Sequence, residues 1–293
     1  MTSRIAVTAG DPRGIGPEII MKALADSRVG GRSDLVIVGP SGAGLEPDVV
    51  IGEWNSAGNA GVAGKLAGRA IERAVELAIA GDVSGIVTAP IDKAALLAGG
   101  YDYPGHTEML AALTHSKVAM MLASEKLRVV LATTHIPLRD VVDSVTENLI
   151  VDIASITRDA LVKWFAVTEP RIALCALNPH AGDGGRFGSE DDDILAPAAR
   201  RAGIAGPFPA DTVFVRAIRG QFDAVIAPYH DVGMTAIKVA SFGSAVNVTL
   251  GLPFPRTSPD HGTALDIAGR GIADPSSFIE ALLLCRRIAA LGQ

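Results

Sequence analysis

The strongest constraint on the fold is a repeated alternation of short apolar runs with amphipathic helical patterns. Most of the apolar runs are continuous, which is typical of parallel strands that are covered on both faces. Eight runs are predicted to be strands: 4–10, 34–40, 85–90, 118–124, 128–135, 171–177, 224–230 and 245–251. Three helical patterns are predicted with the clearest periodicity: 63–81, 148–167 and 274–291. The alternation predicts an α/β fold with a largely parallel sheet.

The chain of 293 residues is long enough for one large or two modest domains. It contains no repeat, no low-complexity tract and no obvious linker. We therefore expect one catalytic unit spanning residues 1–293, with two lobes that share a continuous sheet. The one long glycine-rich connection, residues 41–62, carries few periodic apolar residues and is interpreted as a surface loop or a hairpin.

Composition restricts the possible partners. Hydrophobic residues make up 48% of the chain, so disorder is not expected. The net charge is −6 and no basic cluster occurs, which argues against nucleic-acid binding. No apolar stretch reaches the roughly 18 residues of a membrane helix, and the N-terminus lacks the apolar core of a signal peptide. Cys175 and Cys285 lie in apolar runs, as buried thiols of a reducing compartment do, and we expect a cytoplasmic protein.

Three of the six histidines lie at or just beyond the ends of predicted strands. His135 and His230 end such runs, and His180 closely follows one. Ligands of open α/β sheets bind outside the carboxyl ends of the strands, and neutral imidazoles are good ligands for Zn²⁺ and similar ions. These positions suit a catalytic metal site, and equally three histidines that hydrogen-bond to the backbone. Asp231 is interpreted as a neighbour that orients His230, as a further ligand, or as a helix cap.

Two glycine-containing segments precede predicted helices. In "YPGHTEM", residues 103–109, His106 and Thr107 either hold a phosphate at a helix N-terminus or form a plain threonine cap. The segment "TAGDPRGIGPEII", residues 8–20, leads from a strand to a helix that begins at Pro17. It matches neither the dinucleotide G-x-G-x-x-G fingerprint nor a Walker motif, so it is interpreted as a tight turn.

Residues 237–269 carry polar side chains amid small and apolar residues: Lys238, Asn247, Arg256, Asp260 and His261. Lysine and arginine among strands suggest an anion pocket, the alternative being solvated surface charges. The Asp260–His261 pair suits acid–base chemistry, or it satisfies a turn. Asp211 begins a predicted helix, where capping explains it. A Ser-His-Asp site is set aside because no G-x-S-x-G elbow occurs, and a thiol nucleophile is not expected because neither cysteine lies in a polar strand-end loop.

Seven motifs, which together span nearly the whole chain, resemble those of the 4-hydroxythreonine-4-phosphate dehydrogenase family of pyridoxal phosphate biosynthesis. They are "GDPRGIGPEI", "YPGHTEML", "TTHIPLRDV", "LNPHAGDGGRFGSED", "PADTVF", "YHDVGMTAIK" and "VNVTLGLPFPRTSPDHGTALDIAGRG". The resemblance implies a fold like that of isocitrate and isopropylmalate dehydrogenases, which use NAD or NADP without a Rossmann fingerprint. It also implies a homodimer with the active site at the subunit interface and metal ligands from both subunits.

The resemblance assigns roles to residues on the matching motifs. The implied metal ligands are His135, His180 and His230, which favour Zn²⁺, with Co²⁺, Mn²⁺ and Mg²⁺ as alternatives. The implied substrate contacts are His106 and Thr107, most naturally at the phosphate, and Lys238, Asn247 and Arg256. Asp211 lies in the motif nearest the reacting groups and is taken with Lys238 as catalytic.

The implied reaction oxidises the 3-hydroxyl of a 4-phosphorylated hydroxy acid and then releases CO₂ from the β-keto acid. A divalent metal favours loss of the hydroxyl proton and stabilises the enolate. Lys238 and Arg256 would hold the substrate anions, and we hypothesise that Lys238 also assists proton transfer. Beside His180, three glycines would let the backbone turn closely around metal and substrate: Gly182, Gly184 and Gly185.

Two departures from the family pattern affect the expected substrate. Val232 and Ala236 stand where the family usually has glutamine and often has proline, and residues 41–62 are short. Losing an amide removes hydrogen-bonding groups from the pocket wall. Both departures favour a paralogue that acts on threonate or erythronate phosphate, whereas "GHTE" disfavours the branch that oxidises dihydrodiol carboxylates. A phosphate acyltransferase and a non-catalytic metabolite-binding protein are the alternatives from other classes.

Overall fold

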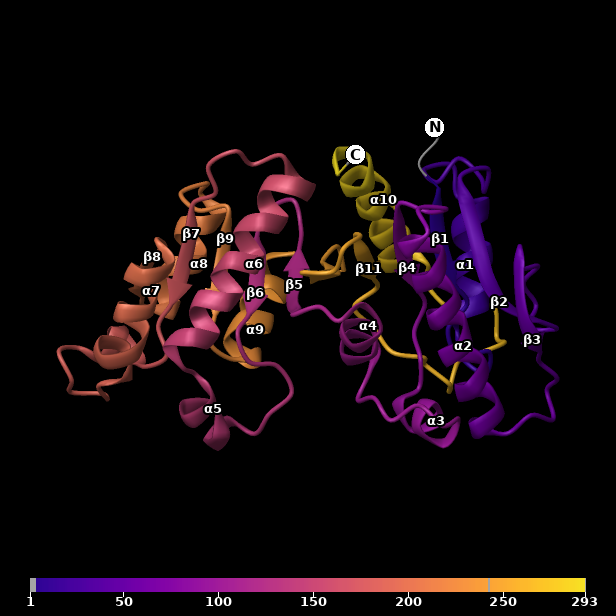
Figure 1. Ribbon diagram of the computed structural model, residues 1–293, viewed down its shortest axis with the longest axis horizontal. Coiled ribbons are helices and arrows are strands. Elements are labelled where there is room, and N and C mark those ends of the chain that lie inside the picture. Colours follow the sequence, from indigo (N-terminus) through magenta and orange to yellow (C-terminus); the bar gives the residue numbers. More distant parts are fainter. Residues whose placement is uncertain (1–3, 242, 293) are drawn as a thin grey trace. The chain divides into compact units, whose positions relative to one another are not determined.

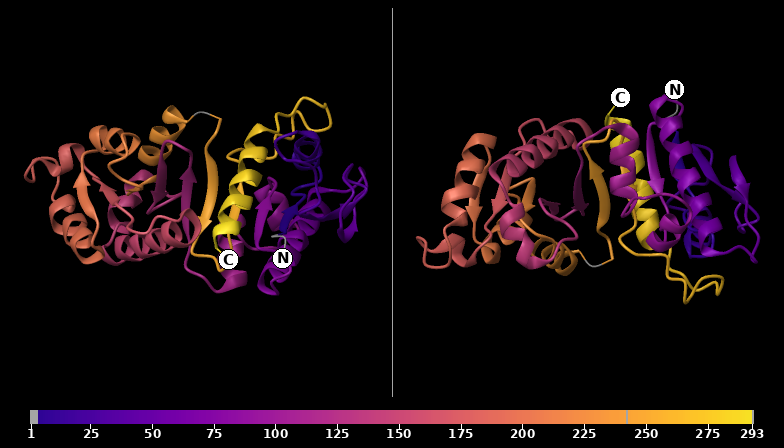
Figure 2. Two further views of the ribbon diagram at one scale, coloured as in Figure 1. Left: turned by 90° about the horizontal axis from the view of Figure 1, so that it is seen from above. Right: turned by 60° about the horizontal axis from the view of Figure 1, so that its bottom comes forward.

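The computed structural model describes residues 4–241 and 243–292 of the chain, which divides into two compact units (Figure 1). Unit 1 combines both ends of the chain, Met1–Lys117 and Leu252–Gln293, and unit 2 is the continuous segment Val118–Gly251. The C-terminal helix accordingly lies with the N-terminal strands in every view (Figure 2). Each unit is built of strands and helices in alternation, and the large, mostly parallel sheet confirms the predicted α/β class.

The described residues of unit 1 form five strands in the spatial order β3-β2-β1-β4-β11. Their bounds are β1 Ile5–Thr8, β2 Leu35–Ser41, β3 Val49–Glu53, β4 Gly85–Thr88 and β11 Arg256–Ser258. β1 runs parallel to β2 and β4, β2 to β3, and β4 to β11. β1 and β4 are buried along their whole length, as expected of central strands that helices cover on both faces.

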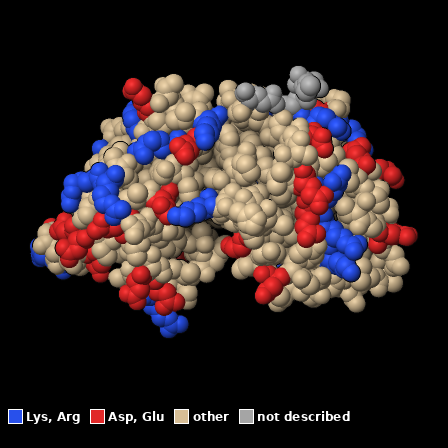
Figure 3. Space-filling model, in the orientation of Figure 1, with Lys and Arg blue, Asp and Glu red and all other residues tan. Residues whose placement is uncertain are grey.

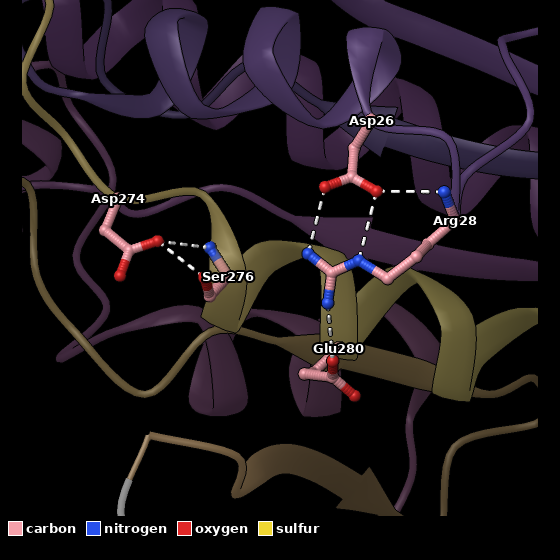
Figure 4. Close-up of polar contacts among 5 residues, drawn as sticks. All are labelled: Asp26, Arg28, Asp274, Ser276 and Glu280. Atoms are coloured by element: carbon pink, nitrogen blue, oxygen red, sulfur yellow. Dashed lines mark hydrogen bonds and ion pairs between the residues drawn. The ribbon is translucent and has the colours of Figure 1, made fainter.

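The helices of unit 1 are α1 Gly16–Ala25, α2 Ala60–Ile79, α3 Lys93–Ala98, α4 His106–Thr114 and α10 Ser276–Leu291. α2 packs on β1 to β4, and α10 packs on β4, β11 and α1. The chain just after α1 is tied to α10 by Arg28, which makes two hydrogen bonds of 3.0 Å to Asp26 and reaches Glu280 at 3.4 Å (Figure 4). Asp274 accepts from the amide and hydroxyl of Ser276 at the start of α10 (Figure 4).

The segment 41–62 differs from the loop or hairpin that its composition suggests. It contains β3, which runs parallel to β2 with Val49 opposite Val38, so it is not a hairpin. The chain reverses between the two strands with the help of Gly42 and Gly44, whose φ angles of +79° and +75° favour glycine. The sequence did not predict β3, because its apolar run is short and lies among glycines.

In the part of unit 2 that the structure describes, six strands lie in the order β10-β5-β6-β9-β7-β8. Their bounds are β5 Ala119–Ala123, β6 Arg128–Leu131, β7 Ile172–Cys175, β8 Ala205–Phe208, β9 Ala224–Ala227 and β10 Val246–Leu250. β5 runs antiparallel to both β6 and β10, whereas β6, β9, β7 and β8 are parallel. The antiparallel β5 follows from the tight connection between β5 and β6, which leaves no room for a crossover helix.

Helices surround the strands of unit 2: α5 Leu138–Ser144, α6 Glu147–Phe165, α7 Ala196–Ala202, α8 Ala210–Ile218 and α9 His230–Ala240. Two short helical turns, η1 Pro179–Gly182 and η2 Asp191–Leu195, lie between β7 and α7. The predicted helices over 63–81, 148–167 and 274–291 correspond to α2, α6 and α10. None of the helices within the described ranges is long and apolar enough to span a membrane.

Candidate functional site

Two of the three strand-end histidines meet in unit 2. β6 ends at Leu131 and β9 at Ala227, earlier than predicted, so His135 lies in the loop after β6 and His230 is the first residue of α9. Their ring centroids are 5.2 Å apart with the planes inclined by 44°. β6 and β9 are parallel neighbours, which is why the segments that follow them converge. His230 Nδ1 is buried without a hydrogen-bond partner, as a nitrogen that awaits a ligand would be.

His180 lies on a loop of unusual backbone geometry. His180, Ala181 and Asp183 have φ angles of 53°, 55° and 46°, in the left-handed region that costs a non-glycine residue about 1–2 kcal/mol. Gly182, Gly184 and Gly185 also have positive φ, so residues 180–185 form an unbroken left-handed run. A Cβ on Gly184 or Gly185 would meet nothing within 4 Å, so these two glycines serve the backbone conformation and not a close approach within the chain.

A buried carboxylate holds this loop against the end of β7. Asp191 is fully buried, and its two oxygens accept hydrogen bonds from the amides of Leu177 (2.8 Å) and Asn178 (2.9 Å). The Asn178 side chain donates in turn to Glu190 at 2.8 Å. The position of His180 is therefore set by a strand end and by Asp191. The His180 imidazole itself is exposed, with Phe187 as its ring neighbour at 6.3 Å between centroids.

The described part of one chain does not assemble three ligands. Across residues 4–241 and 243–292, no group of three His, Cys, Asp or Glu side chains is placed to hold a metal ion. Asp231 lies in the first turn of α9, whose N-cap is Tyr229, so Asp231 is not the cap itself. The structure thus brings His135 and His230 together and leaves His180 outside that pair.

The remaining predicted residues of unit 2 lie on three different elements. Asp211 is exposed in the first turn of α8, Lys238 is exposed in the last turn of α9, and Asn247 is half-buried on β10. Asn247 Oδ1 is buried without a hydrogen-bond partner. Val232 and Ala236, which depart from the family pattern, pack against the hydrophobic core of this unit. Apolar side chains at these two positions therefore contribute to packing.

A second group of predicted residues meets in unit 1. Arg256, at the start of β11, is only 2% exposed, and its Nη2 donates a 2.5 Å hydrogen bond to the hydroxyl of Thr88 at the end of β4. Burial lowers the pKa of Arg256 to about 10, and electrostatic interactions with Cys285 and then Glu108 oppose that shift. Arg256 remains cationic at neutral pH, so a buried positive charge stands at this corner of unit 1.

His106 faces the same charge as a neutral group. It opens α4 after Gly105, which provides no side-chain cap, and its Nε2 is buried without a hydrogen-bond partner although the residue as a whole is half-buried. Burial, with Arg256 and then Lys93 as further causes, lowers the pKa of His106 well below its usual value. Thr107 follows in the first turn of the helix. A buried cation, a neutral imidazole and an open helix N-terminus together suit an anionic group.

The loop after β1 supports this corner. Asp11 is 1% exposed, and its carboxylate accepts from the backbone amide and the guanidinium of Arg13, the shortest bond being 2.7 Å. A Cβ on Gly10 would lie 2.3 Å from the carbonyl oxygen of Pro90, so only glycine fits there. The segment 8–20 is thus the tight turn that its sequence predicts. Asp260 is half-buried, and His261 is exposed with Nδ1 3.1 Å from the carbonyl oxygen of Gly262.

Sequence reasoning missed three polar residues that act on the predicted site residues or their loop: Thr88, Lys93 and Asp191. Thr88 ends the apolar run "GIVTAP", where threonine reads as an ordinary strand residue. Asp191 stands first of three consecutive aspartates, which read as a solvated helix start. Acidic and basic residues are interspersed on the face shown in Figure 3, so surface charge gives no further guide.

Comparison with known proteins identifies the family. The family model described as "Pyridoxal phosphate biosynthetic protein PdxA" matches residues 46–285. The chain belongs to the PdxA family. A 4-hydroxythreonine-4-phosphate dehydrogenase of Xanthomonas axonopodis pv. citri is 50% identical over 217 residues, which cover 72% of this chain and 67% of the relative. A D-threonate 4-phosphate dehydrogenase of Salmonella typhimurium is 42% identical over 327 aligned positions, which cover 98% of this chain and 99% of the relative.

Solved structures agree with the assignment to the PdxA family. The crystal structure of a 4-hydroxythreonine-4-phosphate dehydrogenase from Klebsiella pneumoniae matches with a TM-score of 0.89 and 40% identity, over 99% of this chain and 98% of that one. A β-decarboxylating dehydrogenase of Thermococcus kodakarensis matches with a TM-score of 0.52 and 16% identity over 97% of this chain and 83% of that one, which shows a shared fold. The chain is therefore an oxidoreductase with the expected fold, and as a dehydrogenase it requires a nicotinamide cofactor.

Proposed function

We propose that this PdxA-family member oxidises the 3-hydroxyl of a 4-phosphorylated 3-hydroxy acid, with NAD or NADP and a divalent metal, and that decarboxylation follows. The observation that carries the proposal is the buried cationic Arg256 beside a neutral His106 at the N-terminus of α4. Relatives named for 4-hydroxythreonine-4-phosphate and for D-threonate 4-phosphate define the two candidate substrates. Both candidates carry a phosphate dianion and a carboxylate.

The anionic groups of such a substrate are bound best by residues whose protonation state does not change near neutral pH. Arg256 stays charged, and His106 stays neutral, so its Nε2 can donate or accept according to the tautomer that the anion selects. Thr107 adds a hydroxyl at the first turn of α4. We propose that these residues bind the phosphate and that Lys238 and Asn247 make further substrate contacts.

The donor set of unit 2 suits a divalent metal. His135 and His230 lie 5.2 Å apart between ring centroids, and His230 Nδ1 is buried without a partner. We propose that His180 is the third ligand and that a homodimer supplies it across a subunit interface. Zn²⁺ is the preferred ion for such ligands, with Co²⁺, Mn²⁺ or Mg²⁺ as alternatives. A divalent metal held there would supply Lewis-acid stabilisation of the negative charge that develops on the substrate.

The chain's own groups would move the protons. Oxidation removes a hydride to the nicotinamide and a proton from the 3-hydroxyl, and loss of CO₂ leaves an enolate that takes up one proton. We propose that the Lys238 side chain accepts the hydroxyl proton as the neutral amine and, then an ammonium group, returns a proton to the enolate, and that Asp211 assists near the reacting groups. Both side chains are exposed on unit 2, where they can reach a bound molecule.

The experiment that tests the activity follows NADH or NADPH formation at 340 nm with added Zn²⁺, Mn²⁺ or Mg²⁺. The substrates are 4-phosphohydroxy-L-threonine, D-threonate 4-phosphate and D-erythronate 4-phosphate, with unphosphorylated threonate as the control. Turnover of at least one phosphorylated acid and not of threonate is expected. Silence across the panel contradicts the proposed substrate class, and CoA-dependent acyl transfer or binding without turnover would replace it.

The metal site is tested by metal content in place of activity. Single variants His135→Ala, His180→Ala and His230→Ala are each expected to lose bound metal by mass spectrometry of elements in dialysed protein. His115→Asn is a matched control, because His115 is exposed with a left-handed φ of 52° that asparagine adopts readily. Unchanged metal content in His180→Ala would remove His180 from the site. The proposed homodimer is tested by light scattering, which is expected to give the mass of two chains. Cell fractionation is expected to place the protein in the cytoplasm.

A further inference from the structure

A buried guanidinium needs partners that fix its orientation. Arg256, the first residue of β11, is 2% exposed, and burial lowers its pKa to about 10 because the charged form loses hydration. A planar group with five N–H donors recognises an oxyanion only when its plane and its donor edges face that anion. The affinity of such an arginine for an anion therefore depends on the groups that fix the orientation of its guanidinium plane.

Thr88 stands where it can hold that plane. It is the last residue of β4, is 0% exposed, and accepts the 2.5 Å hydrogen bond from Arg256 Nη2. β4 and β11 are parallel neighbours with Arg256 opposite Ile86, so Thr88 lies two residues further along the adjacent strand. The backbone of both residues is fixed by the sheet. The hydroxyl is consequently a rigid acceptor, whose position does not depend on a mobile loop.

We propose that Thr88 is a positioning residue for substrate binding: its hydroxyl sets the orientation in which the Arg256 guanidinium meets the anionic group of the substrate. The inference rests on the proposed function, in which Arg256 contacts that group. Thr88 acts through Arg256, and it does not itself touch the substrate. A neutral acceptor suits this task, because a carboxylate in its place would neutralise the cation that the substrate anion requires.

A neighbouring threonine provides a control for loss of a buried hydroxyl that does not contact Arg256. Thr257 follows Arg256 on β11, is also 0% exposed, and donates from Oγ1 to the carbonyl oxygen of Ala281 in α10 at 2.7 Å. Thr257→Val thus removes a buried hydroxyl from the same strand without touching the guanidinium. Thr88→Val removes the acceptor at nearly constant volume, and Thr88→Ser keeps it.

The test compares steady-state kinetics of the three variants on whichever phosphorylated acid the wild type oxidises. Thr88→Val is expected to raise KM about tenfold while kcat changes less than about threefold, because a hydrogen bond to a charged group contributes about that factor. Thr88→Ser is expected to stay within about threefold of the wild-type KM. Thr257→Val is expected to lower the melting temperature and leave KM unchanged. A Thr88→Val enzyme with wild-type KM, or a Thr88→Ser enzyme as impaired as Thr88→Val, overturns the proposal.

Calorimetric titration with inorganic phosphate gives a readout that does not depend on turnover. Thr88→Val is expected to bind phosphate about tenfold more weakly than the wild type and Thr257→Val equally well. If the wild type oxidises no tested acid but Thr88→Val still weakens phosphate binding, the proposed function fails and the role of Thr88 stands. Wild-type protein that binds no phosphate and turns over no substrate overturns both. If Thr88→Val does not fold, Thr88→Ala takes its place. Its KM and phosphate affinity are then compared with those of Thr88→Ser by the same criteria.

Discussion

Replacing Asp191 tests how the loop that carries His180 is held. The carboxylate is fully buried and accepts two backbone amides, from Leu177 at 2.8 Å and Asn178 at 2.9 Å. Asp191→Ala removes both acceptors and leaves two amides without partners beside the end of β7. Asp191→Asn keeps one neutral acceptor oxygen and places an NH₂ group where the second amide points.

The expected loss follows from the number of bonds. A hydrogen bond to a charged group contributes about 1.5–3 kcal/mol, so Asp191→Ala is expected to lower the free energy of unfolding by about 3–6 kcal/mol. Asp191→Asn retains one of two acceptors and is expected to lose about half as much. With a urea m-value of about 2 kcal/mol per M, a loss of 3 kcal/mol moves the unfolding midpoint by about 1.5 M.

The assay can be confined to unit 2, because each of the two tryptophans reports on one unit. Trp54 lies in unit 1 and Trp164 in α6 of unit 2, and both are buried. In a Trp54→Phe background, the fluorescence of Trp164 during urea unfolding follows unit 2 alone. Three proteins are compared: the Trp54→Phe parent, which retains Asp191, and the same protein with Asp191→Asn or Asp191→Ala.

The control is Asp192→Ala, since Asp192 is exposed in the same helical turn. It is expected to change the unfolding free energy by less than about 0.5 kcal/mol. A midpoint for Asp191→Ala within about 0.3 M of its parent would show that the two amides find other partners. The conclusion that Asp191 holds the His180 loop would then be wrong.

Three further predictions concern other parts of the chain. Folding lowers the pKa of His106 below its unfolded value near 6.5, so below about pH 6.5 the unfolded state binds a proton that the folded state does not. The free energy of unfolding is therefore expected to fall, by at most about 1.4 kcal/mol per pH unit, as pH drops below about 6.5. His106→Gln should flatten that dependence in melting curves between pH 5 and 7.5, and an unchanged slope would refute the assignment. Gly64→Ala places a Cβ 1.7 Å from the Ala95 carbonyl oxygen, so a loss of about 3 kcal/mol or more is expected by thermal unfolding, whereas Gly262→Ala, with open space around it, should be neutral. Both cysteines are buried with the thiol pKa raised to about 12, chiefly by burial, so they should react with a disulfide reagent only after denaturation; rapid labelling of native protein would contradict their burial.

The sequence predicted the α/β class because burial between helices leaves a continuous apolar record in strands such as Ile5–Thr8 and Ala224–Ala227. It could not predict β8 and β11, which read "AGPF" and "RTS". β11 is a strand because β4 offers it a hydrogen-bonding edge, and its first residue is a buried arginine that no hydrophobic pattern reveals. Tertiary pairing, not local preference, decides such short strands.

The site was predictable where chemistry-bearing residues follow neighbouring parallel strands. His135 and His230 meet because β6 and β9 are adjacent. The convergence of His180 on that pair remains a prediction, because a site completed by a second subunit depends on the assembly and not on one chain. The supporting residues escaped detection because their roles depend on burial: nothing in "GIVTAP" distinguishes Thr88 from a packing threonine.

The two-part construction of unit 1 has a consequence for synthesis on the ribosome. Arg256 lies 168 residues after Thr88, so at about 5–20 residues per second the arginine emerges on the order of 10 to 30 s after the threonine. Until then one edge of β4, a strand of four buried residues that finally lies between β1 and β11, has no partner strand. Such edges promote aggregation, so we expect the nascent N-terminal segment to be prone to aggregation until β11 emerges.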